Sequence, residues 1–346
     1  MAEITNFEQR QIRETIASRD KLFHFFEQEK KQFIETQASQ NRDNAIIAEI
    51  KRIASSFARK GEARSFVRSE LKTVAGVELS DEQLEAINNS VNKPINVITG
   101  GPGAGKTTMV LGLVSALEAL DLKVKLCAPT GRAAKRIAET PALEKFSPST
   151  IHRYLVSPEG QGKKEYDVMI VDESSMIDIN LLLLLLETIP DGASVLFIGD
   201  ADQLPPVGPG QPFRDMIASG AISLNRLTGN FRQSSFSEIV KAARAVIKGE
   251  MPELHESLDA VDFAFIETDS ENVADVILSQ LFEKMPKSML GATYEDIQLL
   301  SPMHSRSAGI SNLNQLVQRR VSKKGQPIYS RKSKDGGLDF YPTDRV

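Results

Sequence analysis

The chain has 346 residues, of which 41% are hydrophobic and 25% charged, and its formal net charge is −4. This composition is ordinary for a globular protein of about two domains, and it argues against a uniformly basic nucleic-acid binder. A single cysteine, Cys127, excludes an internal disulfide and fits a reducing compartment. The longest purely apolar run, the leucines at 181–186, is far shorter than the roughly 20 residues of a membrane span. We therefore expect a cytoplasmic protein with no membrane partner.

Charge is distributed unevenly along the chain. Residues 51–72 and 297–334 are rich in lysine and arginine, whereas residues 250–296 are acidic. Local basic surfaces on an acidic body can bind a polyanion in one groove only. Each basic stretch taken alone is equally well explained as the solvated face of a helix. The charge pattern therefore permits a nucleic-acid partner without identifying one.

The first 77 residues are predicted to form a helical N-terminal region. Ile46, Ile50 and Ile53 recur at the spacing of one helix face, together with Ile47 and Phe57. Residues 21–34 are rich in phenylalanine, and we interpret them as part of a helix–helix core rather than as a platform for stacking bases. This region carries no recognisable chemistry.

The next helix is predicted to begin at Ser80, in the run LSDEQLEAI. Ser80 and Gln83 match a capping box, in which the glutamine amide only satisfies the backbone N–H of the serine. Alternatively, Gln83 hydrogen-bonds the adenine edge of a nucleotide bound at the glycine-rich loop that follows. The spacing alone does not decide between these two roles.

Residues 96–108 read as an apolar strand followed by a glycine-rich turn, and a helix-compatible run comes next. Gly100, Gly105, Lys106 and Thr107 fit the pattern G-x-x-x-x-G-K-[ST] of a phosphate-binding loop. The glycines let backbone N–H groups turn inward to form an anion site, and the following helix adds its positive N-terminal end. Lys106 is expected to reach the β- and γ-phosphates of ATP, and the Thr107 hydroxyl to hold Mg²⁺.

The nucleotide-binding residues predicted from this loop form one continuous run: Gly101, Pro102, Gly103, Ala104, Gly105, Lys106, Thr107 and Thr108. A glycine-rich turn with a chance lysine is the alternative. The strand–loop–helix context speaks against that alternative, because the phosphate loop requires the same context.

A second strand–loop–helix follows, and Thr130, Gly131 and Arg132 lie where its strand meets its helix. A hydroxyl, a bare backbone and a guanidinium suit a phosphodiester, and ligands bind at this end of strands in parallel sheets. The alternative is an N-capped helix with a solvated basic face. Thr150 and His152 end the loop that comes next, where a lone histidine is more often a cap or a core residue. The histidines and the cysteine show no metal-ligand spacing, so we expect no zinc or iron site.

The run DVMIVDESSM reads as an apolar strand that ends in Asp172 and Glu173. Beside a phosphate loop in a parallel sheet, Asp172 can hold Mg²⁺ while Glu173 activates the attacking water. Two carboxylates at the end of a buried strand are costly without an ion or another partner. An ordinary strand that ends in a polar turn is the alternative.

The strand SVLFIG is followed by a proline-stiffened loop that carries Gln203. At the same sheet edge as Glu173, this amide is expected to sense the γ-phosphate and to signal its presence to a neighbouring domain. Arg232 lies beyond the sheet, where it either contacts the γ-phosphate across a cleft or forms a structural salt bridge. Two more strands are predicted at residues 263–267 and 297–303.

Together these stretches resemble the RecD-like branch of superfamily 1 helicases over roughly residues 78–320. SDEQ is similar to the Q motif, GGPGAGKTT to motif I, APTGRAAKR to motif Ia and STIH to motif Ib. VDESSM resembles motif II, GDADQLPPVGPG motif III and LTGNFRQ motif IV. The forms of motifs Ia and III are highly specific to this branch.

The resemblance implies an α/β fold of RecA-like lobes, each a parallel sheet with helices on both faces. ATP would lie between two lobes, and single-stranded DNA would cross their tops. We expect a helical N-terminal region over 1–77, a first RecA-like ATPase lobe over 78–225 and a partial second lobe over 226–346. The second lobe is expected to be incomplete, because the later family motifs V-H-x-x-Q-G-x-E and T-R-A are absent from the sequence.

The resemblance also assigns roles to individual residues. It favours adenine recognition by Gln83, and γ-phosphate contact by Gln203 and Arg232. It favours DNA contact by four side chains: Thr130, Arg132, Thr150 and His152.

The predicted function is that of an ATP-dependent helicase or translocase that moves 5′ to 3′ on single-stranded DNA in repair or recombination, with other subunits as possible partners. A fragment, or a gene split that leaves half a motor, would account for the incomplete second lobe. Two other functions stay open: a nucleotide-gated DNA-binding protein without effective motor activity, and a P-loop ATPase that acts on protein partners.

Overall fold

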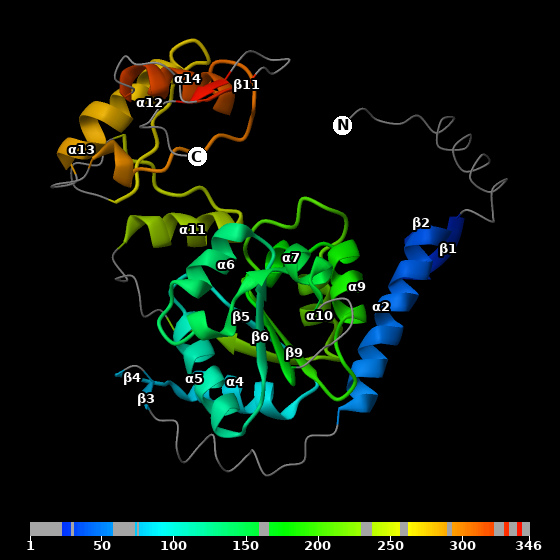
Figure 1. Cartoon of the computed structure of the whole chain (residues 1–346). Helices are drawn as coiled ribbons and strands as arrows, with labels where there is room; N and C mark the ends of the chain where they lie inside the picture. The colour runs from blue at the N-terminus through cyan, green and yellow to red at the C-terminus, as the bar shows by residue number, and fades with distance from the viewer. Residues whose placement is uncertain are drawn as a thin grey trace. The chain divides into compact units, whose positions relative to one another are not determined.

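The computed structural model describes residues 23–28, 31–57, 73–74, 76–158, 166–229, 237–256, 262–288, 293–321, 329–331 and 338–340. The chain forms two compact units, Met1–Arg232 and Gln233–Val346 (Figure 1). The N-terminal region therefore belongs to the same unit as the phosphate loop. The predicted finer boundaries at residues 77 and 225 stay predictions.

The first unit is built on a six-stranded sheet with the strand order β10–β5–β9–β8–β6–β7. Its strands are β5 (Ile95–Gly100), β6 (Val124–Ala128), β7 (Ser149–Thr150), β8 (Val168–Val171), β9 (Ser194–Gly199) and β10 (Ser223–Leu227). All neighbouring strands pair in parallel, so all their carboxyl ends meet at one edge. The predicted α/β fold of a RecA-like lobe is confirmed.

Helices connect these strands, as parallel pairing requires. The connecting helices are α5 (Lys106–Ala119), α6 (Gly131–Ala138), α7 (Ile151–Val156), α9 (Ile179–Glu187) and α10 (Pro212–Ser219), and α4 (Asp81–Asn92) precedes β5. Side-chain oxygens cap four of them by accepting a backbone N–H of the first turn: Ser80 for α4, Thr130 for α6, Thr150 for α7 and Asp178 for α9. These polar caps fix where each helix begins.

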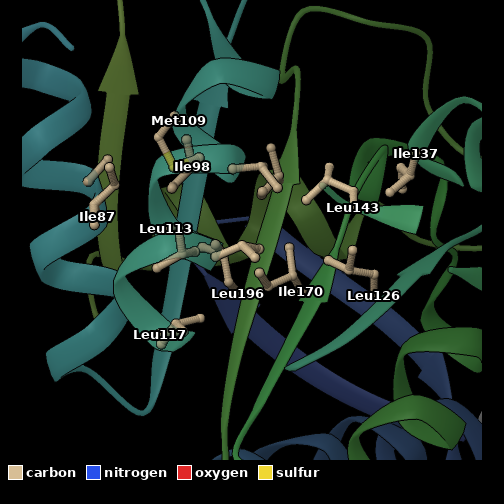
Figure 2. Packing of buried hydrophobic residues seen from close by; sticks show 14 of the residues in the cluster. Ile87, Ile98, Met109, Leu113, Leu117, Leu126, Ile137, Leu143, Ile170 and Leu196 are labelled. Atoms are coloured by element: carbon tan, nitrogen blue, oxygen red, sulfur yellow. The ribbon is translucent and has the colours of Figure 1, made fainter. Parts of the chain in front are cut away.

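The central strands are buried on both faces, and alternate residues enter two separate hydrophobic clusters. On β8, for example, Val168 and Ile170 face the first cluster, whereas Met169 and Val171 face the second. Figure 2 shows members of the first cluster packed in a layer between the strands of the sheet and neighbouring helices, one of which is α5. The second cluster packs under α2, α7, α9 and α10. The sheet is thus held rigidly from both sides.

The helical N-terminal region is confirmed for α2 (Gln37–Ser56). Ile53 is fully buried and Ile46 nearly so, as the predicted apolar face requires, whereas Ile47 is half-exposed. The guanidinium of Arg52 donates to the carbonyls of Leu186 (3.1 Å) and Ile189 (2.9 Å) and pairs with the carboxylate of Asp191. Helix α2 is therefore part of the hydrophobic core of the first unit, packed beside α9.

The helical interpretation of residues 21–34 is wrong. Two antiparallel strands, β1 (Phe23–Gln28) and β2 (Lys31–Thr36), occupy this segment. Phenylalanine favours strands, and although Phe23 and Phe26 also fit helical spacing, the pairing of the two segments decides for strands. A smaller antiparallel pair, β3 (Thr73–Val74) and β4 (Val77–Glu78), precedes α4.

The described residues of the second unit form helices and one two-stranded antiparallel sheet. The elements are α11 (Glu238–Lys248), α12 (Val273–Ser279), a π-helical turn (Gln280–Lys284), α13 (Met285–Ser288), α14 (Ile310–Val321), β11 (Tyr329–Arg331) and β12 (Leu338–Phe340). The strands predicted at 263–267 and 297–303 do not form, because neither apolar run has a neighbouring strand to pair with. A second RecA-like lobe stays a prediction. Across the described helices of both units, none combines the length and the apolar character needed to cross a bilayer.

Candidate nucleotide-binding site

The loop between β5 and α5 has the backbone that the glycine pattern predicts. Gly103 (φ 80°) and Gly105 (φ 79°) lie in the left-handed region, which side chains disfavour. At Gly100 the reason for glycine is packing, since an added Cβ would lie 2.9 Å from the carbonyl oxygen of Leu227. The loop therefore curves tightly into the N-terminus of α5, where backbone N–H groups attract an anion.

Lys106 opens α5, and its side chain lies along the loop. Its Nζ donates to the carbonyl of Gly100 at 2.5 Å and to that of Gly101 at 3.0 Å. Burial lowers the pKa of Lys106, and the carboxylates of Asp200, Glu173 and Asp172 oppose this shift. A partly buried ammonium among carboxylates is well placed to attract the negative charge of a phosphate.

Asp172 and Glu173 follow β8 directly, at the edge of the sheet where the phosphate loop lies. The N–H of Asp172 donates to the carbonyl of Cys127 at 3.0 Å, and the N–H of Glu173 to the Asp172 carboxylate at 2.9 Å. Glu173 has a left-handed backbone, with φ at 53°. A non-glycine residue in this region is strained, and such strain is concentrated at functional sites.

An arginine that the sequence analysis did not select also lies here. The Nη2 of Arg136, on the last turn of α6, is 3.1 Å from Oε1 of Glu173 and 3.4 Å from Oδ2 of Asp172. This contact exists because β6, which leads into α6, is the neighbour of β8 in the sheet. Arg136 is the last residue of the APTGRAAKR run, but its contact with the carboxylates depends on strand order, which is not visible in the sequence.

Gln203 lies in the loop after β9, the strand between β5 and β8. The N–H of Ala201 donates to the Thr99 hydroxyl at 3.1 Å, which ties this loop to the strand of the phosphate loop. The Ser175 hydroxyl is 3.5 Å from Oε1 of Gln203. The predicted position of Gln203 at the same sheet edge as Glu173 is therefore observed.

These residues surround one cavity of about 520 Å³. Its polar side is lined by Pro102, Gly103, Ala104, Gly105, Lys106, Thr107, Thr108, Arg136, Thr140, Asp172, Glu173 and Gln203. Apolar side chains close its inner end: Val110, Leu126, Ile137, Leu143 and Ile170. The volume falls within the range of about 300–1,000 Å³ that is usual for small-molecule sites. The Thr107 hydroxyl and the Asp172 carboxylate are oxygen ligands of the kind Mg²⁺ prefers, so the residues present fit a nucleotide with its metal.

Gln83 does not line this cavity. It forms the predicted capping box: Oε1 accepts from the Ser80 N–H at 2.9 Å, and the Ser80 hydroxyl accepts from the Gln83 N–H. Its Nε2 donates to the carbonyl of Gly105 at 3.1 Å, and the residue is 3% exposed. The side chain of Gln83 thus supports the phosphate loop by binding the backbone carbonyl of Gly105. Contact between Gln83 and adenine stays a prediction, and it would have to replace hydrogen bonds that the Gln83 amide already makes.

The neighbour of Gln83, Glu82, holds the chain where it leaves β10. Its carboxylate accepts from the Thr228 N–H at 2.8 Å and from the Thr228 hydroxyl. The hydroxyl of Thr228 is the main cause that lowers the pKa of Glu82 below its ordinary value of 4.5. The first turn of α4 and the end of β10 are therefore joined by a charged contact.

Glu82→Gln is expected to lower Tm at pH 7, because the amide accepts only one of the two bonds. A depressed carboxyl pKa stabilises the fold above the unfolded-state pKa, and this contribution is lost as the pH falls through the folded-state value. The Tm difference between wild type and variant should therefore shrink below pH 4.5. Thermal melts from pH 7 to pH 3 measure this, and a difference that stays constant contradicts it.

The residues predicted to contact DNA lie at the ends of β6 and β7, which are neighbours. The hydroxyls of Thr130 and Thr150 cap α6 and α7 by accepting backbone N–H groups at 3.2 Å, so the N-capped helix named as the alternative role of Thr130 is present. Gly131, Arg132 and His152 are exposed beside them. The sheet thus gathers these residues at one edge. Arg232 lies outside the described residues.

Arg214 on α10 holds the loop that carries Gln203. Its guanidinium donates to the carbonyls of Ala201 (2.7 Å) and Gln203 (3.1 Å) and to the side chain of Gln211 (3.0 Å). Three bonds from one planar group fix the loop at its base. No sequence pattern indicates this role, since Arg214 lies eleven residues after Gln203 and contacts the backbone of the loop.

Arg214→Ala is expected to lower kcat for ATP hydrolysis about tenfold, because small displacements of a group near the reacting atoms are costly. KM for ATP should change less than about threefold, since Lys106 and the loop glycines are untouched. Arg226→Ala, which removes an exposed arginine of β10, is the matched control. Steady-state ATPase measurements test this, and a fall in kcat for both variants alike would contradict it.

Phosphate loop and sheet together define the class of P-loop nucleoside-triphosphatase domains. The model of the AAA domain family matches residues 78–265, just over half of the chain, and the chain belongs to this family. The ATP-dependent RecD2 DNA helicase of Deinococcus radiodurans is 40% identical over 180 residues, which cover 50% of this chain and 24% of that protein. The RecBCD enzyme subunit RecD of Mycobacterium tuberculosis is 28% identical over 290 residues, which cover 72% of this chain and 50% of that protein.

The chain thus spans half or less of the length of these two relatives. Among solved structures, the Pif1 helicase from Bacteroides in complex with ADP-AlF3 and single-stranded DNA is similar at a TM-score of 0.43 and 17% identity. The match covers 77% of this chain and 64% of that one.

Proposed function

We propose that the chain is the ATPase part of a RecD-like DNA helicase or translocase, which hydrolyses ATP to move along single-stranded DNA. One observation carries this proposal: the phosphate loop, Lys106, the carboxylates of Asp172 and Glu173, and Gln203 all line the same cavity. The chain's similarity to RecD and RecD2 supports DNA as the second ligand. Translocation from 5′ to 3′, a place in repair or recombination and further protein subunits are parts of the same proposal.

Each residue of the cavity has a role in this mechanism. The loop N–H groups and Lys106 bind the phosphates and stabilise the charge that builds up on them during transfer. Glu173 accepts the proton of the attacking water. The Thr107 hydroxyl and Asp172 would hold Mg²⁺, which neutralises phosphate charge when bound. Gln203, which lines the cavity, and Arg232, the last residue of the first unit, are expected to contact the γ-phosphate.

DNA is proposed to lie across the carboxyl ends of β6 and β7. Arg132 offers a guanidinium and His152 a ring at that edge, and Gly131 leaves the backbone accessible. Thr130 and Thr150 cap their helices as acceptors and keep a hydroxyl hydrogen to donate to a phosphate. Contacts of this kind bind the nucleic-acid backbone without reading its sequence.

Single-stranded DNA separates this function from its alternatives. ATPase activity is measured with and without an oligo-dT strand, and a many-fold stimulation is expected. DNA binding without stimulation favours the nucleotide-gated DNA-binding protein, and no binding favours an ATPase that acts on protein partners. The affinity should fall as salt rises, since each phosphate contact on a single strand contributes about −0.7 to the slope of log K against log salt.

A further inference from the structure

Helix α6 reaches from the proposed DNA edge into the nucleotide cavity. It begins at Gly131 and ends at Ala138, so it spans about 12 Å at 1.5 Å per residue. Its first turn holds Gly131 and Arg132, and its last turn carries Arg136 into the cavity. One short, rigid element therefore joins the two proposed sites.

Arg136 is the cation that holds the catalytic carboxylates. Its Nη2 lies 3.1 Å from Glu173 and 3.4 Å from Asp172, whose side chains are only 19% and 17% exposed. The other cation among the residues that line the cavity, Lys106, donates instead to two loop carbonyls. The Arg136 side chain is itself 58% exposed, and its charge-assisted contact favours the carboxylate orientation that makes it. The direction in which Glu173 points thus depends on where α6 places Arg136.

The packing around α6 leaves room for a small movement at its C-terminal end. Ala133 and Ala134 bury only small side chains, and Ile137, which belongs to the first hydrophobic cluster, also borders the cavity together with the following Thr140. Close-packed interiors resist displacement, whereas a side chain that borders open volume has fewer contacts to lose. A shift of α6 would move Arg136 and leave the sheet in place.

We propose that α6 couples DNA binding to ATP hydrolysis through Arg136, which acts as a positioning residue for Glu173. DNA bound at the first turn fixes α6, and Arg136 then holds Glu173 in the orientation that accepts the proton of the attacking water. The inference rests on the proposed function and names the regulation of that site. Where two sites are coupled in their binding free energies the coupling is reciprocal, so a nucleotide that alters the position of Arg136 should also change the DNA affinity, although not by the factor seen in kcat.

Arg136→Ala tests this, with Lys135→Ala as the matched control. Lys135 is on the same turn, is 77% exposed and pairs only loosely with Glu139 at 3.7 Å, so its removal takes the same charge away from α6. Wild type and Lys135→Ala should show the same stimulation of ATPase by oligo-dT. In Arg136→Ala the stimulation should fall about tenfold, within the range of about 5–150-fold that couplings span. Arg136→Lys should restore part of it.

A binding measurement gives a readout that needs no turnover. The affinity for fluorescent oligo-dT is measured by anisotropy with and without a non-hydrolysable ATP analogue. The two affinities should differ in wild type and in Lys135→Ala, and their ratio should approach one in Arg136→Ala. The affinity of Arg136→Ala for the analogue without DNA should stay within about threefold of wild type, as a residue that acts through Glu173 predicts.

Two results would contradict the coupling role of Arg136, and a third would contradict the proposed function. Wild-type stimulation retained by Arg136→Ala overturns the coupling role. A loss of more than about tenfold in analogue affinity without DNA overturns it too, because Arg136 would then bind the nucleotide itself. A wild-type ATPase that DNA does not stimulate contradicts the proposed function instead. If Arg136→Ala does not fold, the same ATPase and binding measurements on Arg136→Lys, which keeps the charge, test the coupling role instead.

Discussion

Lys106→Ala is expected to lower ATP affinity about 100-fold or more and to abolish measurable hydrolysis. A hydrogen bond to a charged group contributes about 1.5–3 kcal/mol, and each 1.4 kcal/mol is a factor of ten in affinity. The Lys106 ammonium lies on the loop that would bind the phosphates, and its loss also leaves the carboxylates of Asp172 and Glu173, which line the same cavity, without this cation. Uncompensated negative charge in the cavity opposes the binding of phosphates further. Binding of a fluorescent ATP analogue and the steady-state ATPase rate measure the two effects.

The control for this variant is Lys93→Ala. Lys93 is exposed and lies two residues before β5, at the end of that strand away from the phosphate loop. Its removal changes the net charge equally and should leave affinity and rate within about twofold, as usual for exposed sites. If Lys106→Ala still turned over ATP at a near-normal rate, the phosphate loop would have no part in the mechanism.

Glu173→Gln is expected to keep nucleotide affinity within about threefold and to lower kcat by about 10²–10⁴, the usual contribution of a positioned base. Glutamine has the same shape and keeps a hydrogen-bond acceptor for Arg136, but it cannot take a proton. Exposed Glu144, changed in the same way, is the control. Single-turnover hydrolysis, measured beside equilibrium binding, separates chemistry from affinity.

Hydrolysis retained by Glu173→Gln would mean that another group is the base. Loss of binding together with hydrolysis would mean that Glu173 holds the nucleotide or its metal rather than the water.

The backbone at Glu173 supplies an independent check, since its φ is 53°. Glycine relieves the strain at such a position, by about 1–2 kcal/mol. Glu173→Gly is therefore expected to raise Tm while it abolishes turnover.

The parts of the site that can be predicted from the sequence are those specified by short local patterns of residues. The phosphate loop is fixed by the spacing of Gly100 and Gly105, and the two carboxylates by their place after an apolar strand. The capping box at Ser80 and Gln83 is likewise a four-residue pattern. Each of these patterns depends only on residues that are close together in the chain, so all three can be recognised from the sequence alone.

The parts that could not be predicted depend on long-range pairing. Arg136 reaches Glu173 because β6 lies beside β8, and Arg214 reaches Gln203 because α10 folds back on the preceding loop. The apolar run at 263–267 has strand-like composition, yet a strand exists only where another strand offers hydrogen bonds. Sequence patterns give the propensity of a segment and not its partner.

Helix α2 precedes the segment that the family model matches, yet it closes the core of that segment. Ile53 is fully buried in the same cluster as Leu182 and Leu185 of α9. A shorter chain that began at residue 78 would keep the whole phosphate loop and uncover this leucine-rich face to water. Large exposed apolar patches promote aggregation. The region without chemistry of its own therefore determines whether the ATPase can be purified as a monodisperse domain.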